Sequence, residues 1–375
     1  MILSETQVAI REGVRAFAQE RIRPNSGHYE RVGGYPNGLF EELGSLGLFG
    51  LIAPAAYGGS DADYVSYALS LIELAAADGA LSTIVSIQNS ILISGLLKDG
   101  TPEQKQRFLP ELISGRMIGA FALTESDAGS DAAAIRSRAE RVAGGWRLTG
   151  AKQFITSGRI AKMVMAVAVT DPAAGRKGMT TFLVPTDRIG YVVDKVEHKL
   201  GQAASDTCAL RFDDLFVEDD LVLGAPGDGY RIALANLETG RIGIAAQAVG
   251  MAQAALEIAV AYAKDRISMG QAIIEHQAVG FRLADLATRL EAARLMVLSA
   301  AALRDAGTPA LKEASMAKLF ASEMAEVVVS GAIQTLGGYG YLEEFGLAKL
   351  YRDVRVCQIY EGTSDIQRMI IARAL

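Results

Sequence analysis

The residue types that could do chemistry in this chain gather in three short polar clusters, at 122–131, 334–341 and 359–365. The last cluster holds Glu361 beside Gly362. A tight turn at this glycine could hold the carboxylate in an apolar setting, where burial would raise its pKa from about 4.3 towards the working pH, as a general base needs. The alternative is a solvated acidic residue just outside a helix start.

The other two clusters also allow two interpretations each. Hydroxyls, carboxylates and a glycine at 122–131 could present several donors to one ligand, or they could form a turn that caps its own backbone. Gly337 and Gly338, at the end of a long periodic segment, could let a cofactor approach the backbone. They could equally end a helix in the left-handed conformation.

Several enzyme classes are excluded by motifs that the chain lacks. It has no GxxxxGK[ST] loop, no GxSxG elbow, and no GxGxxG that follows a strand and opens a helix. Its three histidines and two cysteines show no metal-ligand or CxxC spacing, so we expect no metal site and a reducing compartment. Carboxylates, backbone amides or an organic cofactor must then carry any reaction.

The charge balance and the apolar segments argue against two further classes. Lys and Arg minus Asp and Glu gives 37 − 43 = −6, whereas a nucleic-acid binder usually needs a dense basic face. The N-terminus shows no signal peptide. The apolar stretch 242–263 contains Gln247, Gln253 and Glu257 among many small residues, which favours a buried helix over a membrane span. We therefore expect a cytoplasmic protein without membrane insertion or nucleic-acid partner.

Three regions of different periodicity must position these clusters. Residues 1–115 are helical in pattern, with a capping box at Ser4 and Gln7. Between 116 and 227, short apolar runs separated by turns predict a middle antiparallel β-barrel or sandwich domain. Residues 228–375 predict an up-down helical bundle. The expected fold is a multi-domain α + β protein in the order α, β, α.

The individual elements follow from the same patterns. Expected helices run over 37–49, 62–79, 82–98, 102–114, 230–263, 276–305, 309–336, 343–356 and 364–374, and expected strands over 118–123, 146–148, 163–169, 180–184, 191–193 and 207–212. Thr363 or Ser364 is the natural N-cap of the last helix.

Taken together, in this order and at these distances, the three clusters resemble the acyl-CoA dehydrogenase family. The similarity extends over nearly the whole chain, and the family's α–β–α order is the order predicted above. The residues that carry the resemblance are Ala122-Leu123-Thr124-Glu125-x-x-Ala128-Gly129-Ser130-Asp131 for the first signature, Gln334-x-x-Gly337-Gly338-x-Gly340-Tyr341-x-x-Glu344 continuing to Lys349 and Asp353 for the second, and Tyr360-Glu361-Gly362-Thr363-Ser364 for the loop of the catalytic glutamate.

The resemblance implies FAD as cofactor, between the middle domain and the bundle. Thr124 would lie near the pyrimidine edge, Phe154 would cover the ring where many members have Trp, and Thr156 would bond near N5. Arg266, Gln277 and the 334–338 segment match residues that reach the FAD of a neighbouring subunit, which implies a homo-oligomer, a dimer at least and usually a tetramer. The implied FAD-binding residues are Phe121, Leu123, Thr124, Gly129, Ser130, Phe154, Ile155, Thr156, Arg266, Gln277, Gln334, Leu336, Gly337, Gly338, Thr363, Ser364 and Asp365.

The resemblance also implies the reaction. Glu361 would take the α proton of an acyl-CoA thioester while hydride leaves the β carbon for flavin N5, and electrons would pass to an electron-transfer flavoprotein. Some members place the base immediately before the arginine that Arg241 matches. That position is Gly240 here, which cannot be a base, so Glu361 is assigned the role. The implied substrate-contacting residues are Ser130, Glu238, Arg241 and Gly362.

The substrate class stays open at this point. The stretch 240–245 resembles butyryl-type members, which favours short or medium straight chains and a place in fatty acid β-oxidation. Alternatives with the same fold are an acyl-carrier-protein thioester, a branched or unusual acyl group, or the reductive direction. A flavin-binding relative without turnover is a more distant alternative, against which the intact Glu361 argues.

Overall fold

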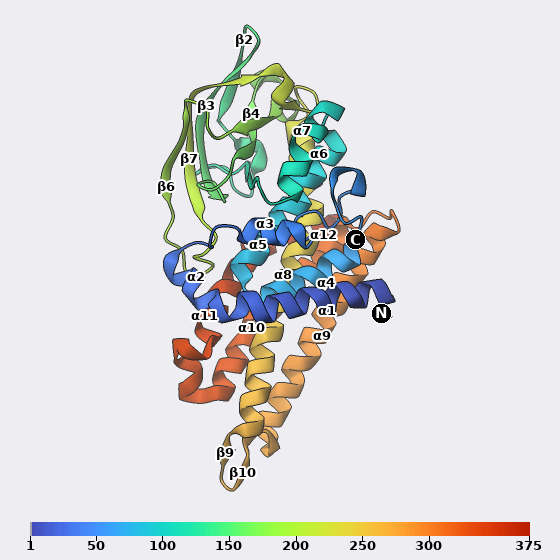
Figure 1. The fold of residues 1–375 in the computed structure, drawn as a ribbon, viewed down its shortest axis with the longest axis vertical. Helices are drawn as coiled ribbons and strands as arrows, with labels where there is room; N and C mark the ends of the chain where they lie inside the picture. Colours follow the sequence, from blue (N-terminus) through green and yellow to red (C-terminus); the bar gives the residue numbers. More distant parts are fainter. Residues whose placement is uncertain (1) are drawn as a thin grey trace.

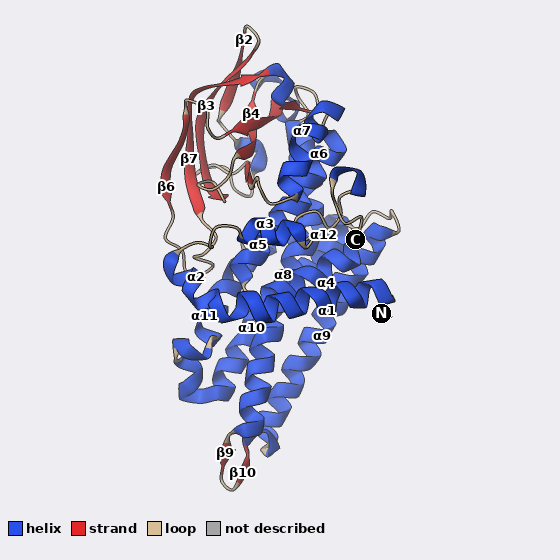
Figure 2. Ribbon diagram, in the orientation of Figure 1, coloured by secondary structure: helices blue, strands red, loops and turns tan. Residues whose placement is uncertain are grey.

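The three regions of different periodicity fold into three parts of an elongated molecule (Figure 1). The computed structural model describes residues 2–375. The sheet lies at one end, and the N-terminal helices cross the middle. The long C-terminal helices extend to the other end, where a short β-hairpin lies at the tip (Figure 2).

The N-terminal part is helical, as predicted. Ser4 closes the expected capping box with Gln7, and π-helical turns at Ala18–Ile22 and Gln88–Ile93 continue two of the helices. The helices are α1 (Glu5–Phe17), α2 (Ser26–Val32), α3 (Leu39–Ser45), α4 (Tyr64–Ala77), α5 (Gly79–Ile87), α6 (Ser94–Asp99) and α7 (Pro102–Ile113).

The middle part is an eight-stranded β-sheet, as expected, but it is mixed rather than wholly antiparallel, and it does not form a closed barrel. Strand order is β6-β7-β3-β2-β4-β5-β8, with β1 paired to β4, so the end strands do not pair with each other and the sheet does not close. Pairs β1–β4 and β2–β4 are parallel. The strands are β1 (Gly119–Ala122), β2 (Arg138–Val142), β3 (Gly145–Thr156), β4 (Met163–Val169), β5 (Met179–Pro185), β6 (Tyr191–Val196), β7 (Thr207–Glu218) and β8 (Val222–Leu223).

The burial of each strand explains which ones the sequence predicted. β4 lies inside the sheet with nearly every side chain buried, so it is a continuous apolar run with the predicted bounds. β2 was not predicted, because all its charged side chains are exposed and only Ala139 is fully buried.

The C-terminal part is the expected helical bundle. The longest helix, α8, packs against α4, α9 and α10, and its small side chains allow these close approaches. The helices are α8 (Gly229–Asp265), α9 (Gln277–Asp305), α10 (Leu311–Leu336), α11 (Leu347–Val354) and α12 (Ser364–Arg373), and the hairpin β9 (Ile267–Ser268) and β10 (Gln271–Ala272) joins α8 to α9.

Two large apolar cores tie the three parts together. One core joins α1, α4 and α5 to the long helices α8, α9 and α10. The other joins the sheet to α7 and to the π-helical turn after α5. The segments Gly79–Asp99 and Gly229–Asp265 are long and apolar enough to span a membrane, but 83% and 72% of their apolar windows are buried inside the fold. They are therefore the central helices of these cores.

Candidate active site

A strained turn between two short helices carries Glu361. The 3-10 helix η11 (Arg355–Gln358) precedes it and α12 follows it. Glu361 has φ +56° and Gly362 has φ +91°, and the left-handed conformation costs a non-glycine residue about 1–2 kcal/mol. The Thr363 hydroxyl accepts from the Ile366 N–H at 3.3 Å, so the predicted N-cap of the last helix is confirmed.

The Glu361 carboxylate lies against the backbone of α8 at Gly240. A Cβ placed on this glycine would be 2.8 Å from Cδ and 2.9 Å from Oε1 of Glu361. Within residues 2–375, the buried Oε2 has no hydrogen-bond partner. Burial raises the pKa of Glu361 to about 7, although the charges of Arg241 and Lys318 oppose this shift. The carboxyl group is therefore not a solvated surface acid, and its pKa suits proton transfer near neutral pH.

Arg241, expected to contact substrate, lies beside this carboxylate on α8, and Glu238, a second such residue, precedes it by three positions. The side chain of Arg241 is buried, which lowers its pKa, and its Nε has no hydrogen-bond partner in the described chain. Glu238 forms an ion pair with Arg304 of α9 at 3.1 Å. The structure thus brings Arg241, Glu361 and Gly362 together, with Glu238 near Arg241 and paired towards α9.

Two residues that the sequence did not indicate donate hydrogen bonds to the backbone of the turn at Glu361 and Gly362. Lys318 Nζ of α10 donates to the Gly362 carbonyl at 2.7 Å. Gln367 Nε2 of α12 donates to the same carbonyl at 2.9 Å and to the Glu361 carbonyl at 3.2 Å. A usable signal for Lys318 exists in the sequence, since Ala314, Ala317 and Ala321 place it on the apolar face of its helix.

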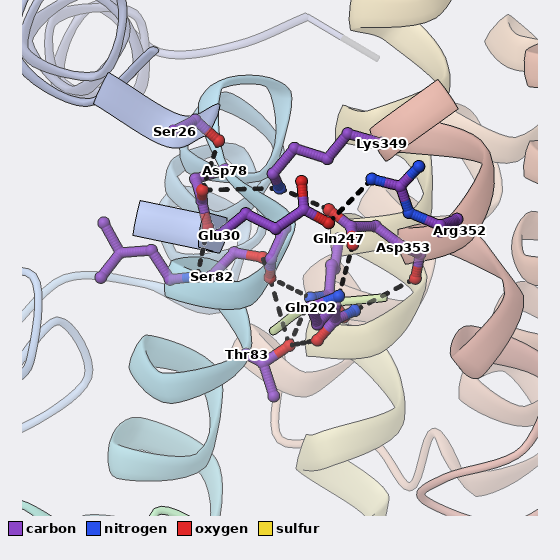
Figure 3. A network of polar contacts seen from close by, with 12 residues as sticks. Ser26, Glu30, Asp78, Ser82, Thr83, Gln202, Gln247, Lys349, Arg352 and Asp353 are labelled. Carbon is purple, nitrogen blue, oxygen red and sulfur yellow. Dashed lines mark hydrogen bonds and ion pairs between the residues drawn. The ribbon is translucent and has the colours of Figure 1, made fainter. Parts of the chain in front are cut away.

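Tyr360, immediately before Glu361, bonds to Gln247, which belongs to a buried polar network with Thr83, Gln202 and Asp353 (Figure 3). Its hydroxyl donates to Gln247 Oε1 of α8, and Gln247 Nε2 donates to Thr83 of α5 at 2.5 Å. Gln202, from the loop after β6, bonds both Thr83 and Asp353. The loop before Glu361 is therefore connected to α5, α8 and α11 and to the loop after β6.

An ion cluster forms the other half of that network and accounts for two residues of the second signature. Lys349 Nζ lies 2.5 Å from Asp353 and 3.6 Å from Asp78, and both carboxylates are buried. Arg352 pairs with Glu30 at 3.0 Å. These charges connect α2, α5 and α11, so their contribution is to the packing of the helices around the site.

The first polar cluster, at 122–131, follows β1 and is bonded to β3 through Thr124 and Glu125. The Thr124 carbonyl accepts from Gln153 N–H at 2.9 Å. Glu125 forms a buried ion pair with Lys152 at 2.8 Å and accepts from the backbone N–H groups of Arg136 and Ser137. This part of the cluster stabilises its own loop, which agrees with the turn interpretation for Glu125.

The residues expected at the flavin ring lie at an irregularity in the same strand. The pairing of β3 with β7 shifts register between Lys152 and Ile155, and Phe154 there has φ +59° and a side chain that is 63% exposed. Ile155 and Leu123 are buried in apolar clusters, Phe121 and Thr124 are half-buried, and Gly129 and Ser130 are exposed. A bulge of this kind re-aims a side chain, and here it presents an aromatic ring on the surface.

The second polar cluster lies at the far end of the bundle, away from the sheet (Figure 1). Gly337 ends α10, as one of the two interpretations predicted, but with φ +62° and ψ −132° it is not in the expected left-handed helical conformation. A shallow pocket of about 430 Å³ is lined by Arg266, Gln334, Leu336, Gly337 and Gly338, among others. Arg266 and the whole 334–338 segment, which are expected to reach a neighbour's cofactor, thus line one pocket, whereas Gln277 is an exposed residue at the start of α9 outside this lining.

The chain matches models of one protein family along almost its whole length. The matching models are described as acyl-CoA dehydrogenase N-terminal domain over residues 4–116, middle domain over 120–215 and C-terminal domain over 227–375. The chain belongs to the acyl-CoA dehydrogenase family. Enzymes of this family are FAD-dependent oxidoreductases, so the resemblance predicted from the three clusters is confirmed.

Individual relatives cover 99% or more of this chain. An acyl-CoA dehydrogenase of Bacillus subtilis is 45% identical over 375 residues, covering 100% of this chain and 99% of the relative. The mitochondrial short-chain specific acyl-CoA dehydrogenase of Bos taurus is 42% identical over 370 residues, covering 99% and 90%. A 3-(aryl)acrylate reductase of Clostridium sporogenes is 40% identical over 375 residues, covering 100% of both.

Solved structures give the same result. Butyryl-CoA dehydrogenase from Megasphaera elsdenii superposes with a TM-score of 0.97 at 37% identity, covering 100% of this chain and 99% of that one. A chain from a structure described as electron transferring flavoprotein of Acidaminococcus fermentans superposes with a TM-score of 0.98 at 37% identity, covering 100% and 98%.

The residues present fit the FAD that acyl-CoA dehydrogenases use. Phe154 offers an exposed aromatic face where the sheet bulges. The hydroxyls of Ser157 and Ser364 are buried without hydrogen-bond partners in the described residues, so both are free to bond a polar group of a ligand. Asp365 is exposed on the first turn of α12.

Proposed function

We propose that this enzyme removes hydrogen from the α and β carbons of a short straight-chain acyl-CoA, with Glu361 as the α-proton base. The observation that carries the proposal is the Glu361 carboxyl group, buried against Gly240 with a pKa raised to about 7. At neutral pH a large fraction of this carboxylate is unprotonated, and its Oε2 has no hydrogen bond within the described residues, so it can accept a proton from a weakly acidic C–H group.

The loop also offers a donor for the thioester oxygen. As the α proton leaves, negative charge develops on the carbonyl oxygen, and a fixed N–H group aimed at it lowers the barrier. Within the described residues, the Glu361 backbone N–H donates to no backbone acceptor. We assign this N–H to the thioester carbonyl, so that the same residue positions the substrate and accepts its proton.

FAD, when bound, accepts the hydride from the β carbon. Phe121, Leu123, Thr124, Gly129, Ser130 and the 154–156 segment would hold it on the sheet side, with Thr363, Ser364 and Asp365 on the bundle side. The pocket at the far end of the bundle supports a second contribution. Arg266 and the 334–338 segment would contact the FAD of a neighbouring subunit in a homo-oligomer, a tetramer in the usual family arrangement.

The short-chain preference rests on the 42% identity to the bovine short-chain enzyme and the superposition on butyryl-CoA dehydrogenase. An electron-transfer flavoprotein is the proposed acceptor, and the match to a chain from such a structure supports it. A second candidate, reduction of an unsaturated acyl group, is favoured by the 40% identity to the arylacrylate reductase.

One experiment separates these candidates. Anaerobic flavin reduction by butyryl-, hexanoyl-, octanoyl- and isobutyryl-CoA should be fastest with a short straight chain and absent in E361Q. More than a few per cent of the wild-type rate in E361Q would refute the assignment of the base. A flat or absent response to all four thioesters, with oxidation of the reduced flavin by a 2-enoyl or aryl-acrylyl thioester, would favour the reductive candidate.

A further inference from the structure

The turn at Glu361 is held by donors from two different helices. The Gly362 carbonyl accepts from Lys318 Nζ at 2.7 Å and from Gln367 Nε2 at 2.9 Å. Both donating side chains are fully buried. Because Glu361 is in the left-handed conformation, the turn relaxes unless its surroundings hold it, and these two bonds fix the peptide unit that follows the base.

Lys318 is a charged donor and Gln367 a neutral one, and burying the charged donor costs solvation free energy. Gln367 shows that a neutral amide can bond this carbonyl, whereas an ammonium loses far more solvation free energy when it is buried. In the described part of the chain, Lys318 has no carboxylate within ion-pair distance. Burial lowers its pKa to about 8, so most of the population still carries the charge at neutral pH. A simple tether would not need this cation.

The charge has a nearby group to act on. The positive charge of Lys318 lowers the pKa of Glu361, together with that of Arg241. Without the charges of Lys318 and Arg241, burial alone would keep Glu361 protonated up to a higher pH. The other ionisable groups facing this pair are Glu238 on α8, Tyr67 on α4, Cys357 on η11 and Glu323 on α10.

These four groups are either paired or neutral, so Arg241 and Lys318 are the charges that act on Glu361. Glu323 is paired with Arg368 at 2.6 Å and Glu238 with Arg304 at 3.1 Å. Burial raises the pKa of the Tyr67 hydroxyl well above the neutral range, and it raises the pKa of the Cys357 thiol to about 12, so both stay neutral.

We propose that Lys318 is a positioning residue for the dehydrogenation, which holds the turn of the base through the Gly362 carbonyl and supplies positive charge that keeps Glu361 ionised. This inference rests on the proposed role of Glu361. It assigns a function to a lysine that does not itself touch the reacting atoms.

The test compares K318M, which loses both donor and charge, with K318Q, which keeps an amide donor but no charge. The matched control is K312M, at a half-buried lysine in the first turn of the same helix that forms an ion pair with Glu313. Each FAD-loaded variant is mixed anaerobically with butyryl-CoA between pH 5.5 and 9, and the rate of flavin reduction is fitted against pH. Affinity for a non-reactive thioester analogue is measured alongside.

Both Lys318 variants should show an inflection at higher pH than the wild type, so the rate loss is largest below pH 7 and shrinks as the pH rises. K318M should also lose about tenfold at its plateau, the usual worth of a charge-assisted hydrogen bond. Analogue affinity and the K312M profile should stay unchanged. If K318M does not fold, K318Q still reports the inflection.

An unchanged inflection in a folded Lys318 variant would overturn the inference, whether or not the plateau rate falls. The proposed function is judged separately, because E361Q has to be inactive at every pH for the base assignment to stand. An inactive E361Q with an unchanged K318Q profile would remove only the role of Lys318.

Discussion

Replacing Gly240 by alanine should separate activity from stability. The new Cβ would lie 2.8 Å from Cδ of Glu361, whereas ordinary contact begins near 3.4 Å, so the carboxyl carbon must retreat by at least 3.4 − 2.8 = 0.6 Å. Oε2 lies closer still to that position and must move by about 1 Å. A displacement of this size at a reacting group costs about 100-fold in rate.

The same substitution should not weaken the fold. Gly240 lies inside α8, and alanine is favoured over glycine in a helix interior by about 1 kcal/mol. The thermal midpoint of G240A should therefore equal or exceed that of the wild type. Anaerobic stopped-flow reduction of the flavin by butyryl-CoA measures the rate, and thermal unfolding followed by circular dichroism measures the stability.

Gly13 provides the matched control. It lies in the helix α1 with no atom within 4 Å of an added Cβ, so G13A should gain stability without losing rate. If G240A reduces its flavin within about twofold of the wild-type rate, the carboxylate does not react from the position described here. A parallel loss of stability and rate in G240A would also refute the reasoning, since the clash would then have disrupted the helix.

Two further predictions concern stability. The pKa of Glu361 is about 7 in the folded protein and lies above its ordinary value of 4.5, so the folded state holds an extra proton between these values and stability falls as pH rises through this window. The glutamine of E361Q does not titrate, so the wild type should lose more thermal stability than E361Q between pH 5 and pH 8. Equal losses in the two proteins would contradict the burial of the carboxyl group. K152M leaves the buried Glu125 without its cation and should cost about 3–5 kcal/mol in urea unfolding, whereas a cost below about 1 kcal/mol would show that the pair is not buried in solution.

Local features of the structure were predictable because they depend on neighbouring residues. The capping residues Ser4 and Thr363 act within four positions of themselves, and their predicted caps are present. Strand β4 is a continuous apolar run, and the three long helices are periodic over many residues, so their existence and approximate bounds followed from the pattern. The spacing of the three polar clusters was sufficient to indicate the family, and with it the glutamate at 361.

Other features could not be predicted because they depend on which surfaces meet. Sheet topology is one, since strand patterns do not determine whether neighbours are parallel, and β1 and β2 both run parallel to β4. The charged strand β2 is another, because its exposed residues resemble a loop in composition.

The surroundings of Glu361 show the same division between sequence and tertiary structure. The sequence by itself determined that a glutamate stands on a glycine turn before a capped helix. Only the tertiary structure placed that carboxylate against Gly240, 121 positions earlier, and brought Lys318 within hydrogen-bond distance of the Gly362 carbonyl. The physical reason is that burial and charge proximity set the pKa of a carboxyl group, and both arise from the packing of α8 and α10 around the loop.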